Sequence, residues 1–158
     1  MNKVINTGLL ILMTGCFAVN TAAAQNQWTP EQKAVWDTET KLSDLMVKGD
    51  FQSFKDYVDD SYQSWPMKSE VPIPKAVKQK EIAYNISLGI KVDFYAAIPL
   101  VIWVNGDYAY ADYYYDIVFE SKEGKKTREH GRWMDVLLKK DGKWVIVGDC
   151  GGADPAHK

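Results

Sequence analysis

Alternating hydrophobic and polar positions predict β-strands through most of the C-terminal half of the chain. Four runs rich in aromatic and β-branched residues lie between turn signals, at residues 90–104, 107–121, 126–140 and 143–148. The dipeptides Asn105-Gly106 and Asp141-Gly142 are typical of type I′ turns, in which both central residues have positive φ. Pro99 in the first run predicts a bulge or an unpaired edge. The pattern indicates a four-stranded antiparallel meander.

Helical spacing dominates the N-terminal half. The residues Thr-Pro-Glu-Gln at 29–32 form a capping box with proline at the first helical position, and Gly49 is placed to end that helix. Asp50 can cap a second, short helix, and residues 75–88 form a third. Residues 61–66 are predicted to form a loop or short strand over the core. Helices followed by strands define an α+β fold, here a curved antiparallel sheet around three helices, a cone whose mouth is suited to a ligand.

The register between the second and third strands decides which side chains share a face. A loop at Lys122-Glu123-Gly124 pairs Asp116 with His130 and Tyr114 with Arg132, and continuing the alternation places Asp149 on that same face. The opposite face holds Tyr113, Tyr115, Ile117, Phe119, Trp133, Leu137, Trp144 and Ile146. Because both faces are apolar over much of their length, we expect helices to cover one and a second subunit to cover the other, giving a homodimer.

The first 24 residues have the pattern of a signal peptide. Their apolar run is too short to span a bilayer, and the alanines at 22–24 form a small-residue cleavage site. A degenerate lipoprotein motif ending at Cys16 leaves lipid anchoring as an alternative to soluble export to the periplasm or medium. We expect a single domain at 25–150 and a flexible tail at 151–158. Cys150 is interpreted as a small buried residue, with an intermolecular link or a reactive thiol as alternatives.

Composition narrows the function mainly by exclusion. The net charge is −2 and no basic stripe is present, which argues against nucleic-acid binding. With two cysteines and two histidines at no metal-ligand spacing, a zinc site is not expected, and no cofactor motif is present. Aromatic residues make up 13% of the chain, enough to line a pocket.

Several of these features together resemble the NTF2-like superfamily, in particular its SnoaL-like and DUF4440-type bacterial members. They are Gly49-Asp50 between two helices, Tyr62 and Trp65 after them, Gly106-Asp107-Tyr-Ala, Arg132-Trp-Met-Asp-Val and Asp141-Gly142-Lys-Trp-Val-Ile. The resemblance covers about residues 30–149 and implies an α+β cone, often dimeric through its convex sheet face. It implies no single activity, since the superfamily contains isomerases, polyketide cyclases, dehydratases and binding domains.

Two functions remain open from the residues. The first is an exported domain that binds a small apolar ligand or a protein partner, without a cofactor, in a pocket with polar groups. Its candidate ligand-binding residues are Tyr62, Trp65, Tyr84, Tyr110, Tyr114, Arg132 and Asp149. The second is an acid–base isomerase or dehydratase in which Asp116 holds His130 as general base, as an Asp and a His do in the cyclase-like members. A solvent-exposed His130 among surface ion pairs is the alternative.

Overall fold

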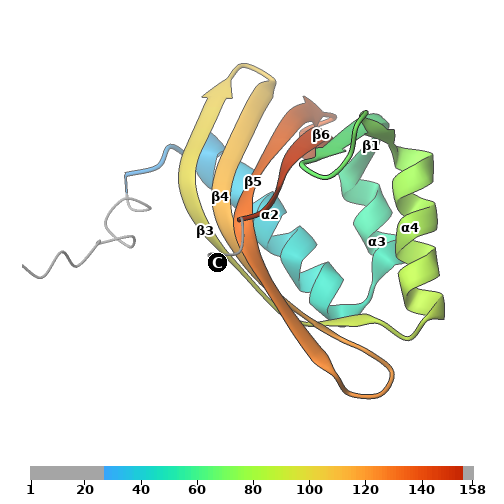
Figure 1. The fold of residues 1–158 in the computed structure, drawn as a ribbon. Helices are drawn as coiled ribbons and strands as arrows, with labels where there is room; N and C mark the ends of the chain where they lie inside the picture. The colour runs from blue at the N-terminus through green and yellow to red at the C-terminus, as the bar shows by residue number, and fades with distance from the viewer. Residues whose placement is uncertain (1–26, 155–158) are drawn as a thin grey trace, which may run out of the picture.

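A computed structural model describes residues 27–154, which form helices packed on one side of a single sheet (Figure 1). The helical elements are α2 (Pro30–Lys48), α3 (Phe51–Phe54), the short 3₁₀ turn η1 (Lys55–Tyr57) and α4 (Lys75–Ser87). The strands are β1 (Val58–Pro66), β2 (Ile73–Pro74), β3 (Lys91–Asn105), β4 (Tyr108–Glu120), β5 (Lys126–Lys140) and β6 (Lys143–Ala153). The α+β class is therefore confirmed.

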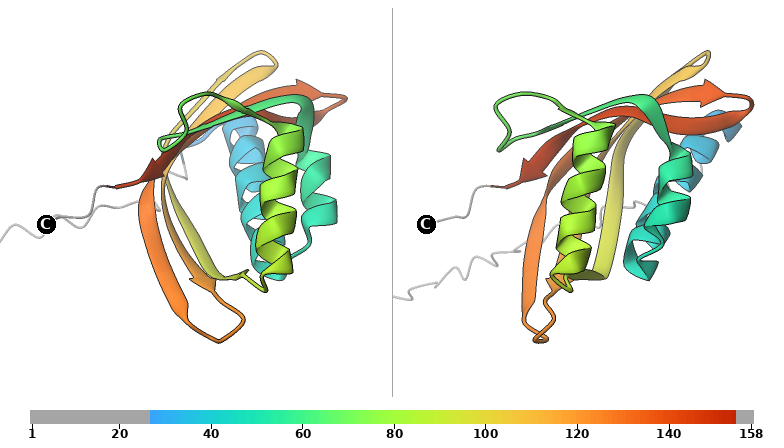
Figure 2. Two further views of the ribbon diagram at one scale, coloured as in Figure 1. Left: turned by 45° about the vertical axis from the view of Figure 1, so that its right-hand side comes forward. Right: turned by 90° about the vertical axis from the view of Figure 1, so that its right-hand side faces the viewer.

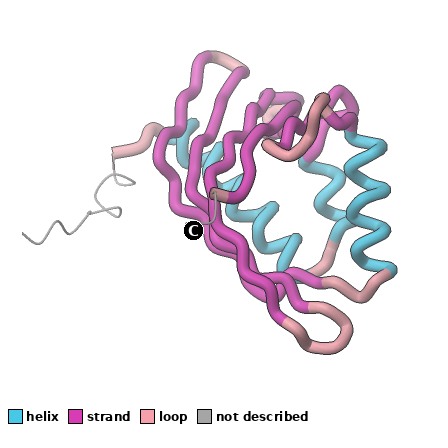
Figure 3. Tube along the Cα trace, viewed as in Figure 1, coloured by secondary structure: helices cyan, strands magenta, loops and turns pink. Residues whose placement is uncertain are grey.

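The sheet is larger than the predicted meander and is mixed. Its order is β2-β1-β6-β5-β4-β3, with β1 parallel to β6 and the other neighbours antiparallel (Figure 3). The prediction of a four-stranded, wholly antiparallel sheet is wrong because residues 61–66 belong to a full strand. In β1, Trp65 pairs with Cys150 of β6, a partner far along the chain that no local pattern indicates.

Local signals at the helix ends and turns are largely confirmed. The Thr29–Gln32 capping box is formed, Gly49 ends α2 with φ of 69°, and Asp50 caps α3. The turn at Asp141-Gly142 has positive φ at both residues, as a type I′ turn requires. The β3–β4 turn lies one residue later than predicted, at Gly106-Asp107, and only Gly106 has positive φ, so it is not a type I′ turn.

The helices cover the face of the sheet opposite to the one that carries Asp116 and His130. The buried core joins Val35 and Leu42 of α2 to Tyr113 and Tyr115 of β4 and to further side chains of that face, namely Ile117, Leu137, Trp144 and Ile146. Figure 2 shows the long strands bending, with the helices on one side only. The predicted site face is therefore the outer face along β4 and β5.

The predicted register of β4 against β5 is confirmed, but a bulge in β6 changes one assignment. Asp116 pairs with His130 and Tyr114 with Arg132. Further along, Val136 pairs with Gly148 while Leu137 pairs with Ile146, which leaves Val147 as an extra residue. The extra residue reverses the alternation, so Asp149 pairs with the buried Asp135 and lies on the inner face. The assignment of Asp149 to the face of Asp116 is therefore corrected.

The predicted signal peptide at 1–24, including Cys16, lies outside the described residues. At the other end, β6 continues to Ala153, so residues 151–153 of the predicted tail are in a strand. No helix within residues 27–154 is long and apolar enough to cross a membrane.

Candidate functional site

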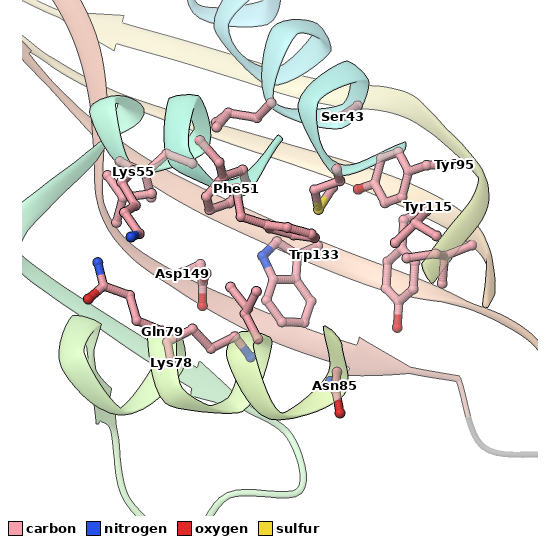
Figure 4. A pocket seen from close by; sticks show the side chains of 18 of the residues that line it. Ser43, Phe51, Lys55, Lys78, Gln79, Asn85, Tyr95, Tyr115, Trp133 and Asp149 are labelled. Atoms are coloured by element: carbon pink, nitrogen blue, oxygen red, sulfur yellow. The ribbon is translucent and has the colours of Figure 1, made fainter. Parts of the chain in front are cut away.

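A pocket of about 510 Å³ lies between the inner face of the sheet and the helices α2, α3 and α4. Its walls are mostly apolar and include eight aromatic side chains: Phe51, Phe54, Tyr62, Tyr95, Tyr113, Tyr115, Phe119 and Trp133. Trp133 and Tyr115 pack edge to face, with ring centroids 6.1 Å apart. In Figure 4, Trp133 lies between Asp149 and Tyr115. The volume and lining suit a compact organic molecule.

Three carboxyl groups meet at one end of this pocket, each from a different element. Glu39 comes from α2, Asp135 from β5 and Asp149 from β6, and all three line the cavity. Glu39 and Asp135 are only 4% and 3% exposed. Asp135 and Asp149 are direct cross-strand partners, an arrangement that is unfavourable when both are ionised.

Burial and mutual repulsion disfavour the ionised forms of this cluster. Desolvation raises the pKa of Asp135 to about 7, with the charge of Asp149 as the next cause. The pKa of Glu39 is raised well above its ordinary value, first by burial and then by the charge of Asp135. A hydrogen bond between the two further raises the pKa of Glu39 and lowers that of Asp135, so Glu39 holds the proton and donates it to Asp135. Around neutral pH they form an acid–carboxylate pair.

Hydroxyl groups hold the carboxyl groups of Asp135 and Asp149 in place. Tyr113 donates its hydroxyl to Asp135 Oδ2 at 2.6 Å, and Ser64 donates to Asp149 Oδ1 at 2.6 Å. The hydroxyl of Tyr62 donates to Asp149 Oδ2. Burial raises the pKa of Asp149, while these two hydrogen bonds oppose that shift. The same surroundings raise the pKa of Tyr62 and Tyr113, chiefly by desolvation, so both hydroxyls keep their protons.

Lysines occupy the rim of the pocket and have partners elsewhere. Lys75 donates to the carbonyl of Val58 and pairs with Asp60, and Lys78 pairs with Glu81 at 3.3 Å. Figure 4 shows Lys78 and Gln79 on α4, across the pocket from Asp149. The positive charge of Lys78 acts to lower the pKa of Asp149. The pocket thus combines an apolar wall, an acidic end and a basic rim.

The structure brings two of the predicted ligand-binding residues into this pocket, Tyr62 and Asp149. It does not bring the other aromatic candidates there. Trp65 is 55% exposed and donates its indole N–H to the carbonyl of Ser69, and Tyr84 is 64% exposed on α4. Tyr110 stacks on Trp103 on the outer face, where Tyr114 is also exposed.

The charged candidates on β4 and β5 also lie outside the pocket. Asp116 accepts hydrogen bonds from both Nε and Nη2 of Arg128, which lowers its pKa. His130 is exposed beside this pair and is not hydrogen-bonded to Asp116. Arg132 bonds Asp154 at 3.2 Å. The cross-strand Asp116–His130 neighbours exist, but on the side of the sheet away from the helices.

Sequence reasoning missed Glu39 and Asp135, although each interrupts a hydrophobic pattern. Glu39 follows Val35 by four positions and precedes Leu42 by three, so it lies within the buried stripe of α2. Asp135 lies between Trp133 and Leu137 on the alternating inner face of β5. An acidic residue inside a buried stripe is a sign of a functional or paired carboxyl. Within residues 27–154, no group of side chains is arranged to hold a metal ion.

Comparison with known proteins supports the fold and leaves the activity open. No family model matches the chain, and no curated protein matches its sequence. Among solved structures, a conserved protein from Planctomyces limnophilus is 16% identical with a TM-score of 0.72, covering 79% of this chain and 97% of that one. A ketosteroid isomerase-like protein from Erwinia carotovora atroseptica is 12% identical with a TM-score of 0.68, covering 81% and 100%.

An NTF2-like protein from Cytophaga hutchinsonii is 20% identical with a TM-score of 0.65, covering 80% of this chain and 100% of the other. At these identities the likeness concerns the fold alone. The described chain therefore has the α+β fold of NTF2-like and ketosteroid isomerase-like proteins, as the resemblance in its sequence implied.

Proposed function

We propose that this protein is an exported binding domain of the SnoaL-like, DUF4440-type group, and that it takes a small, largely apolar molecule into the cone between sheet and helices. The observation that carries the proposal is the pocket itself, about 510 Å³ with mostly apolar walls and a few polar groups at one end. Tyr62 and Asp149 serve as polar contacts there.

Filling the pocket is expected to abolish binding without unfolding the protein. Ala83 of α4 lines the cavity yet is exposed, so Ala83→Trp places an indole in the mouth at little cost to the core. Ala76 is also exposed on α4 but does not line the cavity, and Ala76→Trp is the matched control. Small hydrophobic ketones, acids and amines would be screened by thermal shift. Hits that stabilise the protein and the Ala76→Trp variant should lose their effect in Ala83→Trp; equal stabilisation of both variants contradicts the proposal.

A second candidate is proton transfer on a bound ketone, favoured by the pKa of about 7 at Asp135. Asp135, as the carboxylate of the pair, would take a proton from the carbon beside the carbonyl and then return a proton, exchanged with solvent, to the same carbon of the enolate, while Glu39 keeps its own proton. The test is deuterium incorporation into bound ketones in D₂O, followed by NMR. Exchange that disappears in Asp135→Asn supports catalysis. Exchange no faster than without protein removes this candidate and leaves binding untouched. The pair Asp116–His130 stays a prediction with no role in either proposal.

Two further proposals concern the oligomeric state and the localisation of the protein. A homodimer through the outer sheet face is supported by its exposed apolar side chains: Phe94, Ile98, Val101, Trp103, Tyr108 and Tyr114 are between 44% and 62% exposed. Export is supported by the signal-peptide pattern at 1–24. Mass spectrometry of the protein isolated from its host should identify Gln25 as the first residue. A mass that corresponds to a lipidated Cys16 would contradict soluble export.

A further inference from the structure

The acidic end of the pocket has no basic side chain to balance it. Within residues 27–154, no lysine, arginine or histidine is hydrogen-bonded to Glu39, Asp135 or Asp149. Glu39 and Asp135 are partners of each other, Asp135 is also bonded by the hydroxyl of Tyr113 and the indole N–H of Trp133, and Asp149 is bonded by the hydroxyls of Tyr62 and Ser64. Because ionised carboxyls are costly to bury alone, such a cluster either keeps protons or pairs with a cation.

One oxygen of the cluster has no hydrogen-bond donor. Glu39 Oε1 is buried and has no partner among the described residues, and Glu39, which is only 4% exposed, lines the cavity. Native proteins rarely leave such an atom unsatisfied, so a missing group is expected to complete the site. Protonation of Glu39 removes its charge in the empty pocket but gives Oε1 no partner; an N–H or a positive charge from a ligand would supply one when the pocket is filled.

The walls beside these acids are suited to a positive charge with an apolar body. Tyr113, Tyr115 and Trp133 of the sheet line the same pocket, as do Phe51 and Phe54 of α3. Figure 4 shows Trp133 next to Asp149, with Tyr115 beyond it. The faces of aromatic rings attract cations, and rings combined with carboxylates are the usual receptor for ammonium groups. A purely apolar ligand would leave Asp149 dehydrated with no new partner.

Among the residues that the structure describes, Lys78 is the basic group that acts on Asp149 from across the pocket, and it does not neutralise the cluster. It lowers the pKa of Asp149 but pairs with Glu81, and its side chain remains 32% exposed at the rim. No basic residue is among the causes that shift the pKa of Glu39 or Asp135.

We infer that the ligand of this pocket is an organic cation, an ammonium group on an apolar or aromatic body, whose charge contacts Asp149 and faces the Glu39–Asp135 pair behind it. The inference rests on the proposed binding function and gives its ligand class.

Such a ligand makes the affinity depend on pH in a defined direction. A bound cation favours the ionised form of Asp135, so binding releases its proton and strengthens as the pH rises through about 7. The affinity for a neutral ligand that accepts a hydrogen bond from a protonated carboxyl would instead fall as the pH rises over the same range. The charged or titratable groups facing the cluster are Glu39 from α2, Tyr62 from β1, Lys78 from α4, Tyr95 from β3, Tyr113 from β4 and Asp149 from β6.

The test compares a quaternary ammonium probe with its uncharged carbon isostere. Benzyltrimethylammonium carries no titratable proton, so any pH dependence comes from the protein, and neopentylbenzene has the same shape without the charge. Both are titrated into the protein at pH 5.5 and 8.5, followed by tryptophan fluorescence. We expect the cation to bind at least about 10-fold more tightly at pH 8.5, and more tightly there than the isostere.

Two variants separate the site from general electrostatics. Asp149→Asn should lower the affinity for the cation at least about 10-fold and change the affinity for the isostere by no more than about 2-fold. Asp44 is exposed on α2 and does not line the pocket, so Asp44→Asn makes the same change in net charge and should alter neither probe. Binding of the isostere as tight as that of the cation at both pH values overturns the inference and leaves the proposed binding function standing. Failure of both probes to bind overturns the inference as well, while the Ala83→Trp screen decides the wider function.

Discussion

The free energy of unfolding is expected to fall by on the order of 3 kcal/mol between pH 5 and pH 8.5 in the protein without ligand. Asp135 has its pKa raised to about 7 by burial, against an ordinary value of 3.8. A raised pKa in the folded state means that folding takes up a proton, so stability is full below the unfolded pKa and is lost as the pH rises through about 7. Glu39, also raised, acts in the same direction.

Urea unfolding at several pH values measures this fall, and Asp135→Asn should reduce it by at least half. The amide keeps the shape and stays neutral at every pH, and it also removes the charge that raises the pKa of Glu39. Four other carboxyl groups have lowered pKa values: Asp50, Asp59, Asp93 and Asp116. The stability that they add is lost only at pH values below about 5, so they do not change the slope between pH 5 and pH 8.5. The exposed Asp44→Asn serves as control and should keep the full slope. Stability that rises with pH over this window would contradict the raised pKa values of Asp135 and Glu39.

The second large effect concerns the outer face of the sheet. Ile98→Lys is expected to weaken the proposed homodimer at least about 100-fold, because the two-fold contact would bury the introduced charge twice without a partner. Ile98 is 52% exposed and pairs across the strands with Tyr114. Sedimentation equilibrium would show the wild type as a dimer and the variant as a monomer.

Val71 provides the matched control, since it is 66% exposed on the loop before β2 and away from β3 and β4. Val71→Lys changes an exposed apolar residue in the same way and should leave the dimer intact. Monomeric wild-type protein, or equal dissociation of both variants, would exclude the outer face as the contact.

The elements of this fold could be predicted because their signals are local. A capping box, a glycine after a helix and a two-residue turn each act through neighbouring residues, and the structure has them at 29–32, Gly49 and Asp141-Gly142. The register of β4 and β5 also followed from one loop between alternating strands. These predictions needed no knowledge of distant contacts.

The site could be predicted only in part because it depends on distant contacts. Both faces of the sheet are apolar, so alternation could not decide which face the helices cover, and most site candidates were placed on the outer one. The pairing of β1 with β6 joins residues far apart in sequence, and it brings Tyr62 and Ser64 to Asp149. Glu39 and Asp135 could have been found as acidic residues within buried stripes, had polarity inside the pattern been given as much weight as hydrophobicity.

The extra residue in β6 determines the polarity of the pocket. If Val147 were paired in a regular ladder instead of bulged, Asp149 would point to the outside and the cavity would lose an acid that Tyr62 and Ser64 are placed to meet. Losing the bulge while Val147 is kept can therefore change a receptor for charged molecules into one for neutral ones without any substitution in the pocket wall. Ligand preference in proteins of this shape can diverge through strand register, a change that a comparison of lining residues alone would not detect.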